Sequence, residues 1–148
     1  MSRRTKRLRL TTCVLMAGAW IPAHADGIDA GLWRTVQTPT INGMTGPPRE
    51  TARCLREADV ADLKRTFSPV YGTTNSACEQ VEDEFTPQRL KWRLQCRGQL
   101  DMDLAGQFVF VRPDRYTATI VAISSMLGKT MQEVHTRIEA ERVGACKQ

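Results

Sequence analysis

The sequence has few of the residues that catalysis and metal binding need. Beyond residue 25 it contains one histidine, His135. Zinc sites require closely spaced pairs of cysteines or of cysteine and histidine, and the sequence has neither a CxxC pair nor a cysteine close to this histidine. Ser76, Ser124 and Ser125 lack the G-x-S-x-G context of serine hydrolases. Glycine-rich phosphate loops and basic stretches interleaved with aromatic residues are also missing. We therefore expect no enzyme, no metal or other cofactor and no nucleic-acid partner.

A long hydrophobic run is absent as well. The longest apolar stretch, residues 10–21, is far shorter than the roughly 20 residues that a helix needs to cross a bilayer core. We therefore expect no stable membrane insertion. With 148 residues, 41% of them hydrophobic and 25% charged, the chain has the size and composition of one globular domain.

The first 25 residues have the order of a secretory signal. A basic segment precedes the apolar stretch, and a small-x-small sequence ending at Ala25 provides a cleavage site. The pair Arg3-Arg4 is not followed by the hydrophobic residues of a twin-arginine signal. We predict export by the general secretory route and cleavage after Ala25, which leaves a single domain of residues 26–148.

The positive charge of the chain belongs to this signal. Five of the 21 basic residues precede residue 10, and the remaining sixteen equal the 16 acidic residues in number. The exported domain is therefore neutral, so its charge indicates neither nucleic acid nor anionic lipid as a partner.

Four cysteines remain in the exported domain: Cys54, Cys78, Cys96 and Cys146. An even number in an exported chain predicts two disulfides, for which three pairings are possible. Cys78 and Cys96 lie symmetrically about the turn-like residues 86–89, so a hairpin folded there places both on the same face. We therefore predict the pairs Cys78–Cys96 and Cys54–Cys146.

Apolar and polar residues alternate from residue 89 onward, a pattern typical of strands with one buried face. It covers residues 89–97 and 100–110, and residues 116–124 and 129–143 continue as strands. The predicted fold is mainly β: a curved antiparallel meander sheet of six to eight strands, with one short helix and two disulfides.

The turn near Gly98 predicts a register for the two strands that it joins. A three-residue turn centred on Gly98 keeps their apolar residues on one face and pairs Leu94 with Met102. Arg93 then lies opposite Asp103, where the two form an exposed ion pair.

The first half of the domain is less regular. Residues 39–48 contain two glycines and three prolines, which predicts a loop between strands. Residues 56–65 have apolar residues three apart among charges, which predicts a short surface helix. The alternation of strand 78–85 breaks at Val81, so we expect a bulge or an edge position there.

An ordered set of short sequences spans nearly the whole exported domain. It comprises Gly31-Leu32-Trp33, Arg53-Cys54-Leu55, Trp92-x-x-x-Cys96-x-Gly98, Tyr116-Thr117-Ala118-Thr119 and Gly144-Ala145-Cys146. Together they resemble domain-of-unknown-function family 3617, small exported proteins from Gram-negative bacteria, although that family often ends on Gly-Asp-Cys. The resemblance implies a periplasmic location and a disulfide-bonded, β-rich domain. It provides no catalytic residues.

The remaining ionisable residues are explained by cross-strand pairing on a solvated face. Asp101 and Asp103 share a strand face close to arginines, and the acidic residues 82–84 lie beside a basic strand. His135 shares its face with charged residues. We expect these groups to be solvated rather than to form a catalytic or metal site.

Two functions are consistent with this pattern. The leading hypothesis is a non-catalytic periplasmic binding module that holds a small apolar ligand or an envelope component against one sheet face. Its basis is that the small residues Gly106, Ala118 and Ala122 would leave a groove. The alternative is a protein–protein interaction module, such as an inhibitor or assembly partner of an envelope enzyme, with Asn42 and Met44 as contact residues. Met44 is either packed within its loop, the commoner case, or exposed for such a contact.

Overall fold

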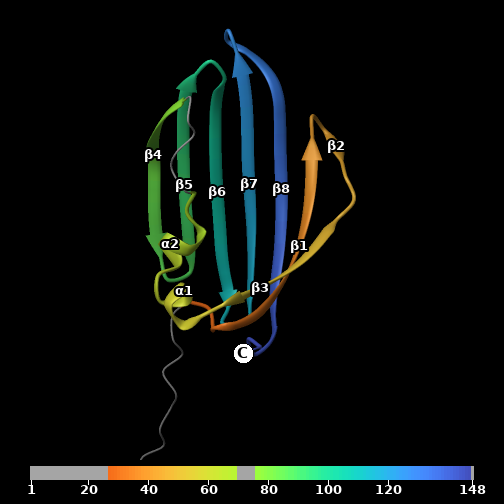
Figure 1. Ribbon diagram of the computed structural model, residues 1–148, viewed down its shortest axis with the longest axis vertical. Coiled ribbons are helices and arrows are strands. Elements are labelled where there is room, and N and C mark those ends of the chain that lie inside the picture. Colours follow the sequence, from red (N-terminus) through yellow and green to blue (C-terminus); the bar gives the residue numbers. More distant parts are fainter. Residues whose placement is uncertain (1–26, 70–75, 148) are drawn as a thin grey trace, which may run out of the picture.

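The structure is a computed structural model that describes residues 27–69 and 76–147. Within these ranges the chain forms strands along most of its length and two short helices (Figure 1). The elements are β1 (Gly31–Ile41), β2 (Met44–Thr45), β3 (Arg49–Leu55), α1 (Glu57–Ala61), α2 (Leu63–Phe67), β4 (Ser76–Thr86), β5 (Arg89–Gly98), β6 (Asp101–Arg112), β7 (Arg115–Met126) and β8 (Lys129–Gly144). The predicted signal and its cleavage after Ala25 lie outside the described residues and stay predictions.

All strands belong to one antiparallel sheet with the order β2-β1-β8-β7-β6-β5-β4, and β3 also pairs with β1. Strands β4 to β8 form a meander, and β1 then lies beside β8, so the first and last strands of the domain are neighbours. The sheet stays open, with β4 at one edge and β2 and β3 at the other. The predicted mainly β fold is confirmed, with eight strands.

The sheet has two unlike ends. At one, which we call the helix end, α1 and α2 lie near the turns that join β4 to β5 and β6 to β7 (Figure 1). At the other, the tip end, the chain turns back between β1 and β2, between β5 and β6, and between β7 and β8 (Figure 1).

Alternation along the strands gives the sheet an inner face, on which the helices pack, and an outer face. The hydrophobic core lies between the inner face and the helices. Its buried members are Ile28, Trp33, Leu55, Leu63, Leu90, Trp92, Phe108, Phe110, Tyr116, Ala118, Ile138 and Ala140.

The single helix expected over residues 56–65 is divided in two. The division is at Asp62, whose backbone is not helical (φ −132°, ψ 75°). Its side-chain Oδ1 accepts a hydrogen bond from the backbone N–H of Arg65, 3.0 Å away, and so caps α2. The new helix direction places Leu63 and Phe67 against the core.

The predicted register between β5 and β6 is wrong by two residues. Leu94 pairs with Leu104 rather than with Met102. The loop is centred on Gln99 instead of Gly98, because Gly98 continues β5 and pairs with the first residue of β4. A shift of two residues keeps every side chain on its face, so the alternation alone does not distinguish the two registers.

The predicted ion pair between Arg93 and Asp103 forms in spite of the shift. In the observed register Arg93 lies opposite Ala105, and Asp103 opposite Gln95. Arg93 reaches diagonally, so that its Nη2 lies 2.6 Å from Oδ2 of Asp103. A long side chain on an exposed face thus spans the diagonal distance between strands.

The prediction of a loop over residues 39–48 is also wrong, because most of this segment forms a hairpin. Strand β1 continues to Ile41, and β2 follows after a two-residue turn at Asn42 and Gly43. Both residues have positive φ, 48° and 83°, as this kind of tight hairpin turn requires. Asn and Gly adopt that conformation at little cost, so the pair Asn42-Gly43 was the informative signal within the Gly- and Pro-rich segment.

The irregularity expected at Val81 is confirmed. The register of β4 against β5 shifts between Gln80 and Glu82, and β4 is an edge strand. The extra residue reverses the faces for the rest of β4.

Both predicted disulfides are present. Cys78 lies directly opposite Cys96 in the register of β4 and β5. Cys54, in β3, is joined to Cys146, just beyond the end of β8. The second bond ties an edge strand to the end of the chain across 92 residues of sequence.

Candidate functional site

The inner face is filled with aromatic side chains at the helix end. The ring of Phe67, from α2, lies 5.0 Å from that of Phe108, 5.8 Å from that of Phe110 and 5.1 Å from that of Tyr116, centroid to centroid. Trp33 packs against Tyr116 from the other side, at 5.3 Å. This half of the inner face is therefore packed core, and its aromatic contacts hold α2 on the sheet.

Two of the three small residues expected to leave a groove make room for the protein's own side chains. The indole of Trp92 occupies the space over Gly106, and Ala118 is buried in the core. Nε1 of Trp92 also donates a hydrogen bond to the carbonyl oxygen of Phe67, at 3.0 Å. Only the third small residue, Ala122, lies outside the packed half.

A continuous row of apolar side chains crosses the inner face between this core and the tip end. Its members are paired from strand to strand across the sheet: Leu94, Leu104, Ala122, Val134 and Ile41, in β5, β6, β7, β8 and β1. We call these five residues the apolar row. Leu94 is buried, the next three are half-buried, and Ile41 is 40% exposed. The apolar row is thus buried at its β5 end, half-buried in the middle and exposed at its β1 end.

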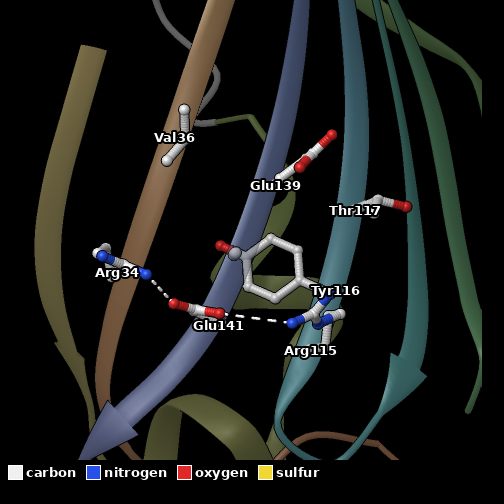
Figure 2. Close-up of a pocket in the computed structure, with 8 residues that line it drawn as sticks. Arg34, Val36, Arg115, Tyr116, Thr117, Glu139 and Glu141 are labelled. Carbon is white, nitrogen blue, oxygen red and sulfur yellow. Dashed lines mark hydrogen bonds and ion pairs between the residues drawn. The ribbon is translucent and has the colours of Figure 1, made fainter. Parts of the chain in front are cut away.

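The outer face bears a shallow depression of about 180 Å³ over β8 (Figure 2). At its floor Glu141 binds two arginines from neighbouring strands, Arg34 of β1 and Arg115 of β7, the latter at 3.4 Å (Figure 2). The hydrogen bond from Arg34 to Glu141, together with their charge attraction, raises the pKa of the Arg34 guanidinium further. Since one carboxylate is shared by two solvated arginines, this cluster serves to link strands β1, β8 and β7.

Two further depressions, of about 190 and 350 Å³, lie over β6 and β7 on the same outer face. Gln107 and Thr119 line both of them. The larger one also contains Arg137, whose Nη2 lies 3.1 Å from Oε1 of Glu139. These depressions are spaces between side chains on an open strand surface, and their charged groups are already paired.

The ionisable residues singled out in the sequence lie where cross-strand pairing places them. His135 is exposed on the outer face, with its Nε2 2.6 Å from Oε1 of Glu133. Asp101 accepts a hydrogen bond from the backbone N–H of Gly98. Across residues 27–69 and 76–147, the structure has no group of three His, Cys, Asp or Glu side chains close enough to hold a metal ion.

The acidic residues 82–84 divide between the two faces because of the bulge. Glu82 and Glu84 each lie 4.0 Å from Nζ of Lys91 on the outer face, as cross-strand pairing predicts. Asp83 points to the inner face instead, where its Oδ2 lies 2.5 Å from Nζ of Lys64 in α2. This second pair helps to attach the helix to the edge strand.

Asp103 is the carboxylate most affected by its surroundings. Arg93 donates two hydrogen bonds to it, from Nε at 2.9 Å and from Nη2 at 2.6 Å. These bonds lower the pKa of the Asp103 carboxyl, and a further bond from Gln95 acts in the same direction. The arrangement favours a permanently charged structural pair over a carboxyl that exchanges protons.

The two proposed contact residues behave differently. Met44 is 75% exposed. Of the two alternatives considered for this residue, packing within its loop is therefore wrong, and exposure for a contact is the one that the structure has. Asn42 holds the hairpin against β8, since its Oδ1 accepts from the backbone N–H of Glu133 at 2.9 Å. Its own N–H donates to the Glu133 carbonyl oxygen at 2.8 Å. Asn42 is therefore a structural residue of the turn, and Met44 is the residue available for contact.

These observations define the chain as a disulfide-linked, open antiparallel sheet with a half-filled inner face and paired charges outside. In the part of the chain that the structure describes, no helix is both long and apolar enough to span a bilayer. Residues 28–146 match the family model described as a protein of unknown function, DUF3617, and the chain belongs to this family. Neither the curated proteins nor the solved structures contain a match to the chain.

Proposed function

We propose that the protein is an exported, non-catalytic binding module of the periplasm that holds a small apolar ligand, or an apolar part of an envelope component, against its inner face. The apolar row is the observation that supports this function. Apolar side chains on five adjacent strands form a band whose three central members are only half-buried, next to an aromatic core. Extended apolar surface of this kind is the usual lining of ligand sites.

The shape of the row favours a slender apolar group. Its centre is Ala122, the smallest of the five side chains, and the larger Leu104 and Val134 lie on the neighbouring strands to either side. A hydrocarbon chain laid across the strands there would cover the half-exposed carbons of all three residues. The binding free energy would come from the apolar area removed from water, without charge recognition.

Native mass spectrometry of the protein taken directly from the periplasm tests this function. We expect a bound apolar molecule on the wild type, and its loss from Ala122→Glu, which places a charge in the middle of the row. Thr119→Glu is the matched control, because Thr119 lies on the outer face of the same strand, opposite Arg137. Apoprotein alone in the wild type, or equal ligand content in both variants, would contradict the proposal.

A further inference from the structure

Exposed apolar side chains are concentrated at the tip end of the sheet. Of the ten large hydrophobic residues that are exposed among the described residues, six lie in or beside the three tip-end turns. They are Ile41 and Met44 around the β1–β2 turn, Leu100 in the β5–β6 turn, and Met126, Leu127 and Met131 around the β7–β8 turn. We call these six residues the apolar rim; in Figure 1 the β7–β8 and β5–β6 turns are uppermost, and the β1–β2 turn lies below them at the side of the sheet, in keeping with the pairing of Ile41 with Val134.

The turns at the helix end have the opposite character. They consist of residues 86–89, Thr-Pro-Gln-Arg, and residues 112–115, Arg-Pro-Asp-Arg. Such polar residues are ordinary for solvent-exposed turns. Phe85 and Val111 are exposed beside these two turns, but the turns themselves carry no apolar side chain other than proline, whereas Leu100 and Leu127 lie within tip-end turns. Connecting strands by turns therefore does not itself require exposed apolar residues at a turn.

Leu127 gives the sharpest reason to look for a contact. It occupies the first position of a two-residue turn with φ 52°, followed by Gly128 with φ 76°, and its side chain is completely exposed. The β1–β2 turn has nearly the same backbone conformation and carries Asn42 at the equivalent position. Leucine is disfavoured in this left-handed region, whereas asparagine adopts it readily. Leu127 therefore costs the fold stability and gains no packing in return.

The rim residues of the β5–β6 turn and the β7–β8 turn are close neighbours. Asp101 pairs with Ser125, which brings Leu100 beside Met126. Lys129, opposite Met126 in the hairpin, is exposed and forms no ion pair with any residue that the structure describes. The tip thus combines protruding apolar side chains with one free ammonium group.

We propose that the apolar rim docks on the surface of a lipid bilayer, with Leu127 and its neighbours inserted among the headgroups and upper acyl chains. No single turn carries more than three of the six side chains, so none of the three turns alone offers the roughly 800 Å² per partner of a standard protein interface. A bilayer accepts separate protruding side chains without needing a matching surface, and a lysine beside them fits the phosphate level. Docking would bring the nearby apolar row close to the membrane surface.

This inference rests on the proposed export of the chain but not on the proposed ligand. A protein whose apolar row binds nothing could still dock through its rim, and the reverse is equally possible. The vesicle experiment below therefore distinguishes failure of the rim from failure of the ligand site, because native mass spectrometry of the same variants reports only on the latter.

The test is flotation of the purified processed protein with mixed phosphatidylethanolamine–phosphatidylglycerol vesicles and with pure phosphatidylcholine vesicles. Leu127→Asn combined with Met131→Gln should weaken vesicle binding by about tenfold. The melting temperature should stay equal or rise, because asparagine fits the turn. Val111→Thr with Val143→Thr is the control: both residues are about as exposed as Met131 and lie away from the tip end, so their replacement should leave binding unchanged.

Repeating the flotation in high salt distinguishes binding by apolar insertion from binding by charge attraction. Binding through the rim should persist in high salt and on phosphatidylcholine, because it depends on apolar insertion. No binding by the wild type, equal binding by the rim variant, or binding lost fully in salt would overturn the proposal. A wild-type dimer in solution that Leu127→Asn converts to monomer would also overturn it, since the rim would then contact a second copy of the chain.

Discussion

The indole ring of Trp92 fills the space that a side chain on Gly106 would occupy. A β-carbon at Gly106 would lie 2.3 Å from both Cε2 and Cζ2 of Trp92. The two residues are paired across β5 and β6, and the hydrogen bond from Trp92 to the Phe67 carbonyl continues the contact into α2. The missing side chain at Gly106 thus allows a sheet residue to hold the helix.

Gly106→Ala should lower the free energy of unfolding by about 2 kcal/mol, because the buried ring has no room to move away from the new methyl group. Gly144→Ala is the control, since a β-carbon there meets no atom within 4 Å. Urea denaturation followed by the fluorescence of the buried tryptophans measures both. Equal stability of the two variants would show that Trp92 can repack.

The two disulfides should differ in their contribution to stability. Closing the 18-residue separation of Cys78 and Cys96 is worth about 3 kcal/mol by the loop-entropy model, and closing the 92-residue separation of Cys54 and Cys146 about 4.6 kcal/mol. Replacing each pair by alanines and comparing urea midpoints measures the difference. A larger loss from the Cys78–Cys96 pair would mean that the edge strand β4 depends on its crosslink more than chain entropy predicts.

The sequence predicted the fold well where side-chain alternation was the determining signal. It assigned β5 to β8 to strands, the Val81 bulge to its position and both cysteine pairs to their partners. It failed where two solutions share the same alternation. The register of Leu94 is one such case, because Met102 and Leu104 lie on the same face. The pairing of Gly98 with β4 extends β5 by this residue and so moves the turn to Gln99, which selects Leu104 as the partner of Leu94.

The pair Arg93–Asp103 should make stability depend on pH in the acid range. Since Arg93 lowers the pKa of Asp103 in the folded state, the pair stabilises the protein above the unfolded-state pKa of the carboxyl, and this contribution disappears as the pH falls through the lower folded pKa. Asp103→Asn should therefore lower stability at neutral pH and converge with the wild type in acid. Repeating the comparison in an Arg93→Gln background should remove most of the difference, because only the weaker contributions, such as the bond from Gln95, remain.

Tyr116 should produce the corresponding effect at alkaline pH. Burial raises the pKa of its phenol, which the hydrogen bond with Thr35 opposes only in part. The folded state thus favours the neutral phenol, so stability is complete below the unfolded-state pKa and declines as the pH rises beyond it. Tyr116→Phe should lose about 1 kcal/mol at neutral pH with its hydrogen bond and show a shallower alkaline decline. Unfolding curves across alkaline pH measure both, and an unchanged alkaline slope would contradict the assignment.

The candidate site was harder to predict than the fold. The alternation placed Gly106, Ala118 and Ala122 correctly on one face, but the sequence does not show that Trp92 and Phe67 fill the space over the first two. The apolar row follows from the pairing of five strands, including β1, which joins the sheet beside β8 at the far end of the sequence. The pairing of two strands that lie so far apart in the sequence leaves no pattern in the residues around either strand. Leu127, by contrast, could have been found, because a leucine before glycine in a tight hairpin is unusual.

Export and oxidation of the chain underlie both functional proposals, and one measurement tests them together. Intact mass is determined for the protein isolated from expressing cells, after exposure to an alkylating agent under denaturing, non-reducing conditions. We predict a chain of residues 26–148 that is four hydrogens lighter than its reduced form and carries no alkyl group. A chain that still begins at Met1 and takes up alkyl groups at its cysteines would contradict this account.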